Sequence, residues 1–375
     1  MTKTLADMEE RIQDIEKNMA RNTTIEKHAA DFKTDMEGKL EAVNVEVAGL
    51  KTALVKAFDE MKGVLITMET GRTRGVVNRP SGDRENNYNI IVAGGTNSVE
   101  MFNWRQRTWS PLQSLKKYRY GATSFIYNDH MTIAGGTCGG SDDDMIRMNV
   151  GPNPDPLTHW NACAGKLPAK LRFHSSVLYN DQLIVTGGYG CGNRNVTSDL
   201  ISEVQLVPPY AVKTLSKMPE KRQNHSMEIF DDNVLIVGGR TSGAFRDNLG
   251  SVLMYDLKKN ELKQLSPLPY EVSNMATVRW GDNIVVIGGD DTHDRTLDKV
   301  IIYNVLTEQS HMLPPMSCKR RGCTAVVVAN NIVVLGGSGD QGRLKSVECF
   351  NFERYTWEEL PEMSKARFWH TAVVV

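Results

Sequence analysis

Six pairs of adjacent glycines divide most of this chain into segments of nearly equal length. Each pair follows a short apolar run, as in VLIVGG, IVVIGG and IVVLGG, and successive pairs begin 41 to 52 residues apart. The first glycines of the pairs are Gly94, Gly135, Gly187, Gly238, Gly288 and Gly336. A repeat of this period predicts an array of similar structural units rather than one irregular core.

Each period contains four short strand-like segments and no helix-length segment. A run ending in a turn signal (HSMEIFDDN) precedes the glycine pair, a second apolar run (SVLMYDL) follows a polar loop, and a Trp- or Leu-containing run (TWEEL) closes the unit. A four-stranded unit repeated radially is a blade of a β-propeller, so the sequence predicts an all-β, six-bladed propeller. The glycines would allow positive φ and close backbone approach, and the Trp or Leu would pack between blades.

This pattern resembles the kelch repeat, whose signature is a double glycine followed by a Val-Glu/Tyr strand and a Trp. The resemblance covers residues 86–375 in six copies and implies a kelch propeller that binds protein partners through its loops; some kelch-like propellers are enzymes. The second unit departs from the pattern with MIRMN, and Leu215 and Ser310 replace the Trp in units three and five.

The chain ends on RFWHTAVVV, and its β-branched residues predict a buried strand. The first glycine unit lacks its own first strand, and this run aligns with the first strands of other units, such as RRGCTAVVV. The C-terminal strand is therefore predicted to pair into the first blade and close the ring, which removes an exposed sheet edge.

Residues 1–70 follow a different period. Sixteen of nineteen positions spaced alternately by three and four residues are apolar, which predicts an α-helical coiled coil, interrupted near Asn22, Glu26 and Lys33. The predicted oligomerisation positions include Leu40, Val43, Val47, Leu50, Leu54 and Met61. The alternative is a single amphipathic helix packed on the propeller. The mixture of Leu, Ile, Val and Met at the apolar heptad positions does not distinguish a dimer from a trimer. The polar, turn-rich residues 71–85 are predicted to be a flexible linker before the propeller at 86–375.

The composition argues against several classes of function. A net charge of −1 argues against nucleic-acid binding, and the sequence shows no signal peptide or long apolar span, so we expect a cytoplasmic protein without membrane association. No phosphate-binding loop or nucleophile motif occurs, and we expect neither enzymatic activity nor a cofactor.

Three groups of side chains could still suggest a metal site. His174, His225 and His370 occupy one repeat position, which favours an architectural role over a ligand cluster. The spacing Cys318-x4-Cys323 is a weak metal signal, and the acidic run Asp142–Asp144 is interpreted as a solvated loop rather than a cation site. We therefore expect no metal.

The candidate partner-binding residues lie in two sets of loops. Loops after the glycine pairs carry an arginine at nearly the same offset in four units, at Arg194, Arg246, Arg295 and Arg343. Loops leading into the first strands add Tyr118, Tyr120, Phe173, Asn224, Asn274, Arg321, Phe368 and Trp369. Aromatic and arginine side chains are enriched at protein interfaces, and guanidinium groups bind carboxylates, so an acidic or amphipathic peptide is the expected ligand. The alternative for the loop arginines is that their position simply favours a long polar side chain.

Three hypotheses for function remain open. The first is a self-associating, non-enzymatic scaffold that presents several propellers to a partner protein. The second is an adaptor that delivers targets to a ubiquitin ligase. Many kelch proteins do so through a BTB domain and an adjoining helical domain upstream of the propeller. We expect the heptad segment not to replace these domains, so another subunit would be needed. The third, an enzyme with an active site in the channel, has no recognisable catalytic set to support it.

Overall fold

The chain divides into two units, Met1–Asn78 and Arg79–Val375, and each is considered by itself. The computed structural model describes residues 11–13, 16–17, 19, 32–42, 45, 49, 88–136, 142–151, 159–190 and 196–375.

In the first unit, the described residues are helical. Residues 32–42 form a continuous helical stretch with exposed side chains, among them Leu40 at 63% exposure. Lys39 pairs with Asp35 at 2.8 Å, an i,i+4 contact of the kind that supports a helix in water. Val43, Val47, Leu50, Leu54, Met61 and the predicted linker lie outside the described residues, so the coiled coil stays a prediction. No helix in the described part of the chain is long and apolar enough to cross a membrane.

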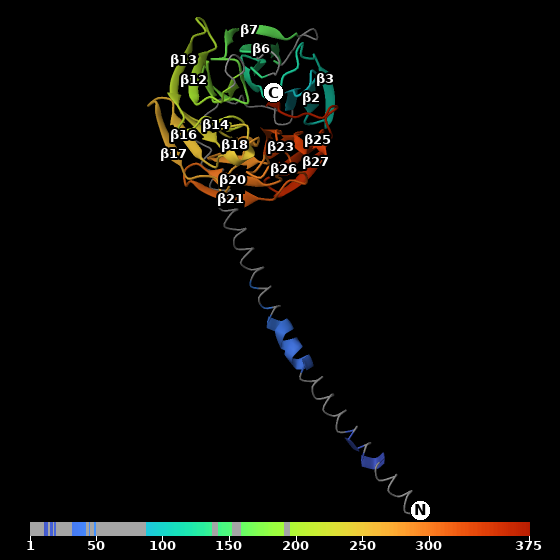
Figure 1. The fold of residues 1–375 in the computed structure, drawn as a ribbon. Helices are drawn as coiled ribbons and strands as arrows, with labels where there is room; N and C mark the ends of the chain where they lie inside the picture. Colours follow the sequence, from blue (N-terminus) through green and yellow to red (C-terminus); the bar gives the residue numbers. More distant parts are fainter. Residues whose placement is uncertain are drawn as a thin grey trace, which may run out of the picture. The chain divides into compact units, whose positions relative to one another are not determined.

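The second unit is a ring of six four-stranded antiparallel sheets, as predicted (Figure 1). Blade 1 contains β28 (His370–Val374), β1 (Asn89–Gly94), β2 (Val99–Asn103) and β3 (Thr108–Leu112). Blade 2 contains β4 (Thr123–Tyr127), β5 (His130–Ala134), β6 (Asp144–Asn149) and β7 (Asn161–Lys166). Blade 3 contains β9 (Ser175–Tyr179), β10 (Gln182–Thr186), β12 (Leu200–Gln205) and β13 (Val212–Lys217).

The remaining blades follow the same order from the inner to the outer strand. Blade 4 contains β14 (Ser226–Phe230), β15 (Asn233–Val237), β16 (Val252–Asp256) and β17 (Glu261–Leu265). Blade 5 contains β18 (Ala276–Trp280), β19 (Asn283–Ile287), β20 (Val300–Asn304) and β21 (Gln309–Leu313). Blade 6 contains β22 (Thr324–Val328), β23 (Asn331–Leu335), β26 (Val347–Asn351) and β27 (Thr356–Leu360). Short elements in the loops are β8 (Leu171–Arg172), β11 (Tyr189–Gly190), β24 (Ser338–Gly339), β25 (Gly342–Arg343) and the 3₁₀ helix η2 (Phe245–Asp247).

The C-terminal strand closes the ring, which confirms the prediction from the ending of the sequence. β28 pairs antiparallel with β1 from Gly94 opposite His370 to Ile90 opposite Val374. Asn89 and Val375 extend this ladder by exchanging two backbone hydrogen bonds of 2.9 Å. In Figure 1 the red end of the chain accordingly lies beside the blue-green strands that begin the propeller.

The glycine pairs connect each blade to the next. Both glycines of every pair have positive φ, and the second donates its N–H to a carbonyl in the loop that enters the next blade. The six bonds measure 2.7–2.9 Å and run from Gly95 to Arg119, Gly136 to Leu171, Gly188 to Arg222, Gly239 to Val272, Gly289 to Arg320 and Gly337 to Arg367. A Cβ on Gly288 would lie 2.3 Å from the Arg320 carbonyl oxygen, so the approach requires glycine.

Tryptophans of the outer strands join neighbouring blades, as predicted. Trp109 of blade 1 donates its indole N–H to the Pro361 carbonyl after blade 6, at 2.7 Å. Trp357 of blade 6 donates to the Pro314 carbonyl after blade 5, at 2.8 Å. Trp160 makes the same kind of bond to Gln113, at 2.9 Å.

Four buried arginines stabilise the loops around the glycine pairs, and the sequence analysis did not identify them. Arg119, Arg222, Arg320 and Arg367 are each at most 2% exposed. Each donates to the carbonyl of the first glycine of its own blade, at 2.7–3.1 Å. The repeat alignment could have revealed three of them, because Arg119, Arg222 and Arg320 each precede the first glycine of the pair by 16 residues.

Two of these arginines form fully buried ion pairs. Arg320 binds Glu348 at 2.8 Å, and Arg367 binds Glu100 at 2.8 Å. Blade 5 has Val272 and Ile301 at the two corresponding positions, both completely buried. The same space is therefore filled either by an ion pair or by two apolar side chains.

Removing the closing strand should destabilise the whole propeller. A chain ending at Trp369 loses the β28–β1 ladder and the buried Val373, so we expect at least about 4 kcal/mol lower stability. All six tryptophans lie between residues 104 and 369, so urea unfolding followed by Trp fluorescence reports on the propeller. As a control, removing Val375 alone should cost no more than about 1 kcal/mol. Equal midpoints for the two truncations would contradict ring closure by β28.

The buried ion pair should show strong coupling between its two members. Arg320→Leu leaves the Glu348 carboxylate buried without its partner and should cost about 3–5 kcal/mol. Adding Glu348→Leu should recover much of this loss, since it reproduces the apolar pair of blade 5. A double-mutant cycle in urea measures the coupling, and additive effects of the two substitutions would contradict this account.

Candidate functional site

A ring of six residues surrounds one opening of the central channel. The loop into the first strand of each blade contributes one residue, giving Gly121, Phe173, Asn224, Asn274, Gly322 and Trp369, here called the mouth ring. The backbone N–H of each member donates to the carbonyl of the equivalent residue in the neighbouring blade, at 2.7–3.0 Å. The six bonds form a closed cycle, so the backbone at this opening is fixed by the architecture of the propeller.

All six members of the mouth ring have positive φ, between 49° and 65°. Glycine adopts this conformation freely and asparagine does so more readily than most residues, which accounts for four members. Phe173 and Trp369 are bulky side chains in a region that costs roughly 1–2 kcal/mol for an L-residue. Strain of this kind is typical of functional positions, because the backbone alone would favour glycine.

Five aromatic side chains gather at the mouth ring, here called the aromatic cluster: Tyr118, Tyr120, Phe173, Phe368 and Trp369. The centroid of the Trp369 indole lies 3.9 Å from that of Phe368, 4.7 Å from that of Phe173 and 5.7 Å from that of Tyr120. Tyr118 packs on Tyr120 at 5.6 Å and is 37% exposed, and the other four are partly exposed. The sequence analysis predicted all five, and the structure brings them together.

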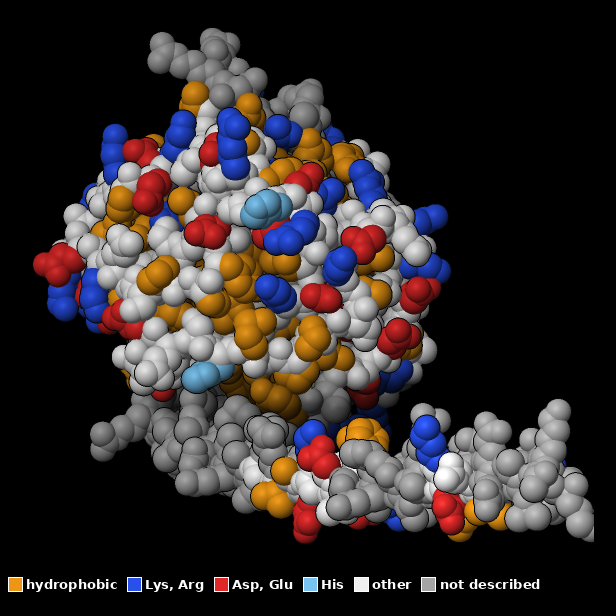
Figure 2. Space-filling view, turned by 60° about the horizontal axis from the view of Figure 1, so that its bottom comes forward, with side chains coloured by type: hydrophobic (Ala, Val, Ile, Leu, Met, Phe, Trp, Pro, Cys, Tyr) orange, Lys and Arg blue, Asp and Glu red, His pale blue; other side chains and the backbone are white. Residues whose placement is uncertain are grey.

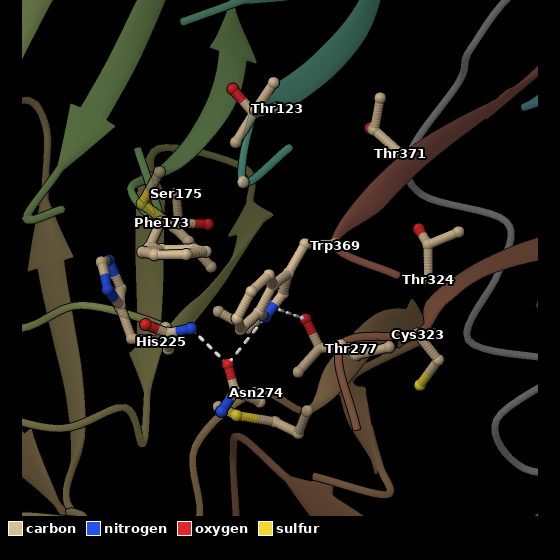
Figure 3. Close-up of a pocket in the computed structure, with 18 of the residues that line it drawn as sticks. Thr123, Phe173, Ser175, His225, Asn274, Thr277, Cys323, Thr324, Trp369 and Thr371 are labelled. Atoms are coloured by element: carbon tan, nitrogen blue, oxygen red, sulfur yellow. Dashed lines mark hydrogen bonds between the residues drawn. The ribbon is translucent and has the colours of Figure 1, made fainter. Parts of the chain in front are cut away.

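Hydrogen bonds hold the indole in place. In Figure 3 the Trp369 ring lies between Phe173 and Asn274, and its N–H donates to the Asn274 side-chain oxygen at 3.0 Å. Asn224 donates to the same oxygen. Asn274 in turn donates to a carboxylate oxygen of Asp290 at 2.8 Å. Asn274 and Asn224, both predicted from the sequence, therefore fix the position of the Trp369 indole in the aromatic cluster.

Charged side chains border the same opening. Asp290 is completely buried, and this burial raises its pKa, opposed by the Asn274 amide and the Arg321 guanidinium. Arg321 contacts Asp290 at 3.4 Å and Asp294 at 3.1 Å. Arg240 is 9% exposed, and its Nε and Nη1 have no hydrogen-bond partner in the described part of the chain. Desolvation lowers its pKa, and its guanidinium lies 5.0 Å from the Phe245 ring.

Arg172 adds a third guanidinium beside the aromatic cluster. It donates to the Tyr120 hydroxyl at 2.6 Å and lies 5.1 Å from the Phe173 ring. The sequence analysis missed Arg172 and Arg240. The repeat alignment contained the signal, since Arg240 directly follows a glycine pair and Arg172 directly precedes a mouth-ring residue.

Three of the four predicted loop arginines lie in the described residues, and all three are exposed. Arg246 lies in η2, and its side chain is 84% exposed. Arg295 already binds Asp291 at 2.7 Å, which lowers the pKa of that carboxyl and occupies the guanidinium. Arg343 lies in β25 and is exposed. Arg194 lies outside the described residues.

The inner strands line a channel below the mouth ring, with a cavity of about 250 Å³. Serine and threonine hydroxyls from all six blades contribute to its wall, and Thr123, Ser175, Thr277, Thr324 and Thr371 are labelled in Figure 3. Glu228 is the one acidic or basic residue among the described lining residues other than histidine.

The three repeat-equivalent histidines pack between blades. A Cβ on Gly135, Gly187 or Gly336 would lie 2.7–3.0 Å from the imidazole Cε1 of His174, His225 or His370, respectively. Burial lowers the pKa of His174 to about 4 and that of His225 and His370 to about 3, so the three side chains are neutral. The structure supports the architectural interpretation of this repeat position.

The other candidate metal residues are also accounted for. Asp142, Asp143 and Asp144 contact Lys117, Lys166 and Arg119 at 3.7, 3.6 and 2.7 Å. Burial raises the pKa of the Cys323 thiol to about 11, which suits an inert core side chain. Within the ranges that the structure describes, no three His, Cys, Asp or Glu side chains are grouped to hold a metal ion.

Charges of both signs are interspersed on one face of the propeller. Figure 2 shows basic and acidic side chains interspersed on the face in view, with hydrophobic side chains in a band between them. Neither sign dominates this face.

Comparisons with known proteins agree with the repeat pattern. Residues 210–375 match the family model described as the KLHDC2/KLHL20/DRC7 Kelch-repeats domain. The chain is 27% identical over 209 residues to Kelch-like protein 41a of Danio rerio, which covers 55% of this chain and 34% of that protein. It is 26% identical over 200 residues to Alpha-scruin of Limulus polyphemus, covering 50% and 21%. It is 31% identical over 118 residues to Kelch-like protein 7 of Mus musculus, covering 31% and 19%.

The chain thus spans about a third or less of these relatives. A solved structure titled "Structure of YjhT" superposes with a TM-score of 0.58 at 16% identity, covering 68% of this chain and 86% of that one. At this identity the likeness concerns the fold alone. Together with the six-bladed fold, these similarities support a propeller built from kelch repeats.

The buried histidines predict a loss of stability in mild acid. A histidine whose folded pKa is about 3 contributes stability that is present above its unfolded pKa of about 6.5 and is lost as the pH falls below it. Each contributes up to about 1.4 kcal/mol per pH unit over this window.

His225→Met, which copies Met275 of the next blade, should therefore reduce the slope of stability between pH 6.5 and 4. Urea unfolding at several pH values, followed by Trp fluorescence, measures this slope. His311→Met, at an exposed position of β21, is the matched control and should leave the slope unchanged. An unchanged slope in His225→Met would refute the role of burial.

Proposed function

We propose that this protein is a non-enzymatic protein-binding module whose propeller takes a segment of a partner protein at the mouth ring. The observation that carries the proposal is the presence of Phe173 and Trp369 at positive φ, where the equivalent positions hold only glycine or asparagine. Aromatic side chains are the residues that most often dominate the free energy of protein interfaces. Because the closed backbone cycle fixes their position, binding requires little ordering of the site.

The charges around the aromatic cluster favour a ligand with a carboxylate. Arg172, Arg240 and Arg321 border the mouth, and their positive charges favour an anionic group there. Asp290 and Asp294 neutralise part of this charge through Arg321. The ligand proposed is therefore an amphipathic peptide that combines an apolar side chain with an acidic one. Arg246, Arg295 and Arg343 would add weaker contacts at the periphery.

The N-terminal heptads would make the molecule multivalent. If residues 1–70 form a coiled coil, two or three propellers share one assembly, and a weak single-site affinity becomes a stronger avidity. Delivery of the bound partner to a ubiquitin ligase by another subunit is a narrower version of the same proposal, in a cytoplasmic setting.

The binding proposal can be tested with a random-peptide display selection on the full chain. Trp369→Gly should lower the affinity for the selected peptides at least about 30-fold, which is the effect expected of a hot-spot tryptophan. It should still fold, because Gly121 and Gly322 occupy equivalent positions. Met312→Ala, which alters a 51% exposed apolar side chain on β21, is the matched control. Selected peptides that bind Trp369→Gly and the unaltered chain equally would refute the site.

Self-association is tested by light scattering of the full chain and of residues 81–375. We expect a dimer or trimer for the full chain and a monomer for the propeller, because the heptads supply the contacts. Two monomers would refute the coiled-coil part of the proposal and leave the peptide-binding part intact.

A further inference from the structure

Glu228 breaks the repeat pattern at one position of the inner strands. In each blade, one residue of the inner strand pairs with the residue that lies three positions before the glycine pair. In the other five blades this inner-strand residue is apolar: Phe125, Val177, Val278, Val326 or Val373. In blade 4 the register places Glu228 opposite Leu235. A carboxyl group thus occupies a place that the repeat otherwise gives to an apolar side chain. Local exceptions of this kind tend to mark function, because the fold alone would favour the common residue.

Two hydroxyl groups lie beside Glu228 in the wall of the channel. Thr277 donates its hydroxyl proton to Oε1 of Glu228 at 2.8 Å. Ser226 contacts the Thr277 hydroxyl, and because Thr277 has only one proton, Ser226 must be the donor of that bond. The lone pairs of Ser226 Oγ therefore remain available as acceptors. Glu228, Thr277 and Ser226 all line the cavity of about 250 Å³.

Desolvation of the Glu228 carboxyl outweighs the interactions that stabilise its charged form. Glu228 is partly buried in the wall of the channel, and desolvation raises the pKa of its carboxyl to about 7. The hydrogen bond from Thr277, and the charge and the backbone N–H of Arg279 in β18, lower the pKa in part. The Arg279 guanidinium itself donates to the carbonyls of Ile229 and Gly281. The nearby His225 stays neutral. Above pH 7, the channel therefore contains one negative charge beside several oxygen acceptors.

We propose that the channel binds a primary ammonium group, held by the carboxylate of Glu228 and the hydroxyl oxygens of Ser226 and Thr277. An ammonium group carries one positive charge and three N–H donors, which match one carboxylate and two hydroxyl oxygens. A divalent cation fits less well, since it takes several carboxylate ligands. The group can belong to a free small amine or to the lysine side chain of a partner. This inference is independent of the peptide-binding proposal at the mouth ring.

The proposal is tested by thermal unfolding of the full chain followed by Trp fluorescence. Methylammonium chloride at about 100 mM should raise Tm by about 3 °C at pH 8 relative to tetramethylammonium chloride, which has no N–H donors. The apparent affinity should fall about tenfold between pH 8 and pH 6, because a proton then competes for Glu228.

Substitutions at Glu228 distinguish this site from a general salt effect. Glu228→Gln keeps the size of the side chain, and Glu228→Val copies four other blades, so both should fold and both should lose the methylammonium effect. Glu359→Gln, at an exposed position of β27, is the matched control and should retain it. Replacing methylammonium by Nα-acetyl-lysine amide, which keeps the side-chain ammonium group, tests whether a lysine side chain can bind in the channel. A Glu228-dependent shift with either compound supports the proposal and identifies the source; the absence of such a shift with both would overturn it.

Discussion

Two cycles of backbone hydrogen bonds connect the blades, and the rest of the propeller depends on them. In one, the second glycine of each pair donates to the loop that enters the next blade; in the other, the mouth-ring residues donate to one another. Each cycle contains six bonds and closes only when β28 pairs with β1. Because these bonds are satisfied between blades rather than within them, no blade can complete its own hydrogen bonding alone.

The backbone geometry of the cycles determines which side chains can occupy the channel opening. Positive φ favours glycine and asparagine, and a glycine next to a carbonyl leaves no room for a Cβ. The buried arginines then saturate the carbonyl of the first glycine in four blades, while blade 5 fills the corresponding space with Val272 and Ile301. The propeller therefore accepts either polar or apolar side chains beside the first glycine of each pair. It requires positive φ at the glycine pairs and at the mouth ring.

Against this background, departures from the repeat are informative. Phe173 and Trp369 occupy strained positions and lie in a cluster of partly exposed rings. Arg240 is a buried cation with unpartnered donors, and Glu228 is a carboxyl at an apolar repeat position. In a structure repeated six times, such exceptions are the places where we propose binding, because the fold alone would favour the common residue.

The sequence by itself determined the number of blades, the four strands of each blade and the closing role of residues 370–374. These follow from periodicity, because glycine pairs and β-branched runs recur at fixed spacing and the first unit lacks its inner strand. It also identified the five aromatic residues at the mouth through their repeat position. Only the tertiary structure showed that Arg320 and Arg367 are buried, that Arg295 is already paired, and that Glu228 faces the channel. Those facts depend on contacts between residues far apart in the chain, and a local pattern does not distinguish a buried guanidinium from an exposed one.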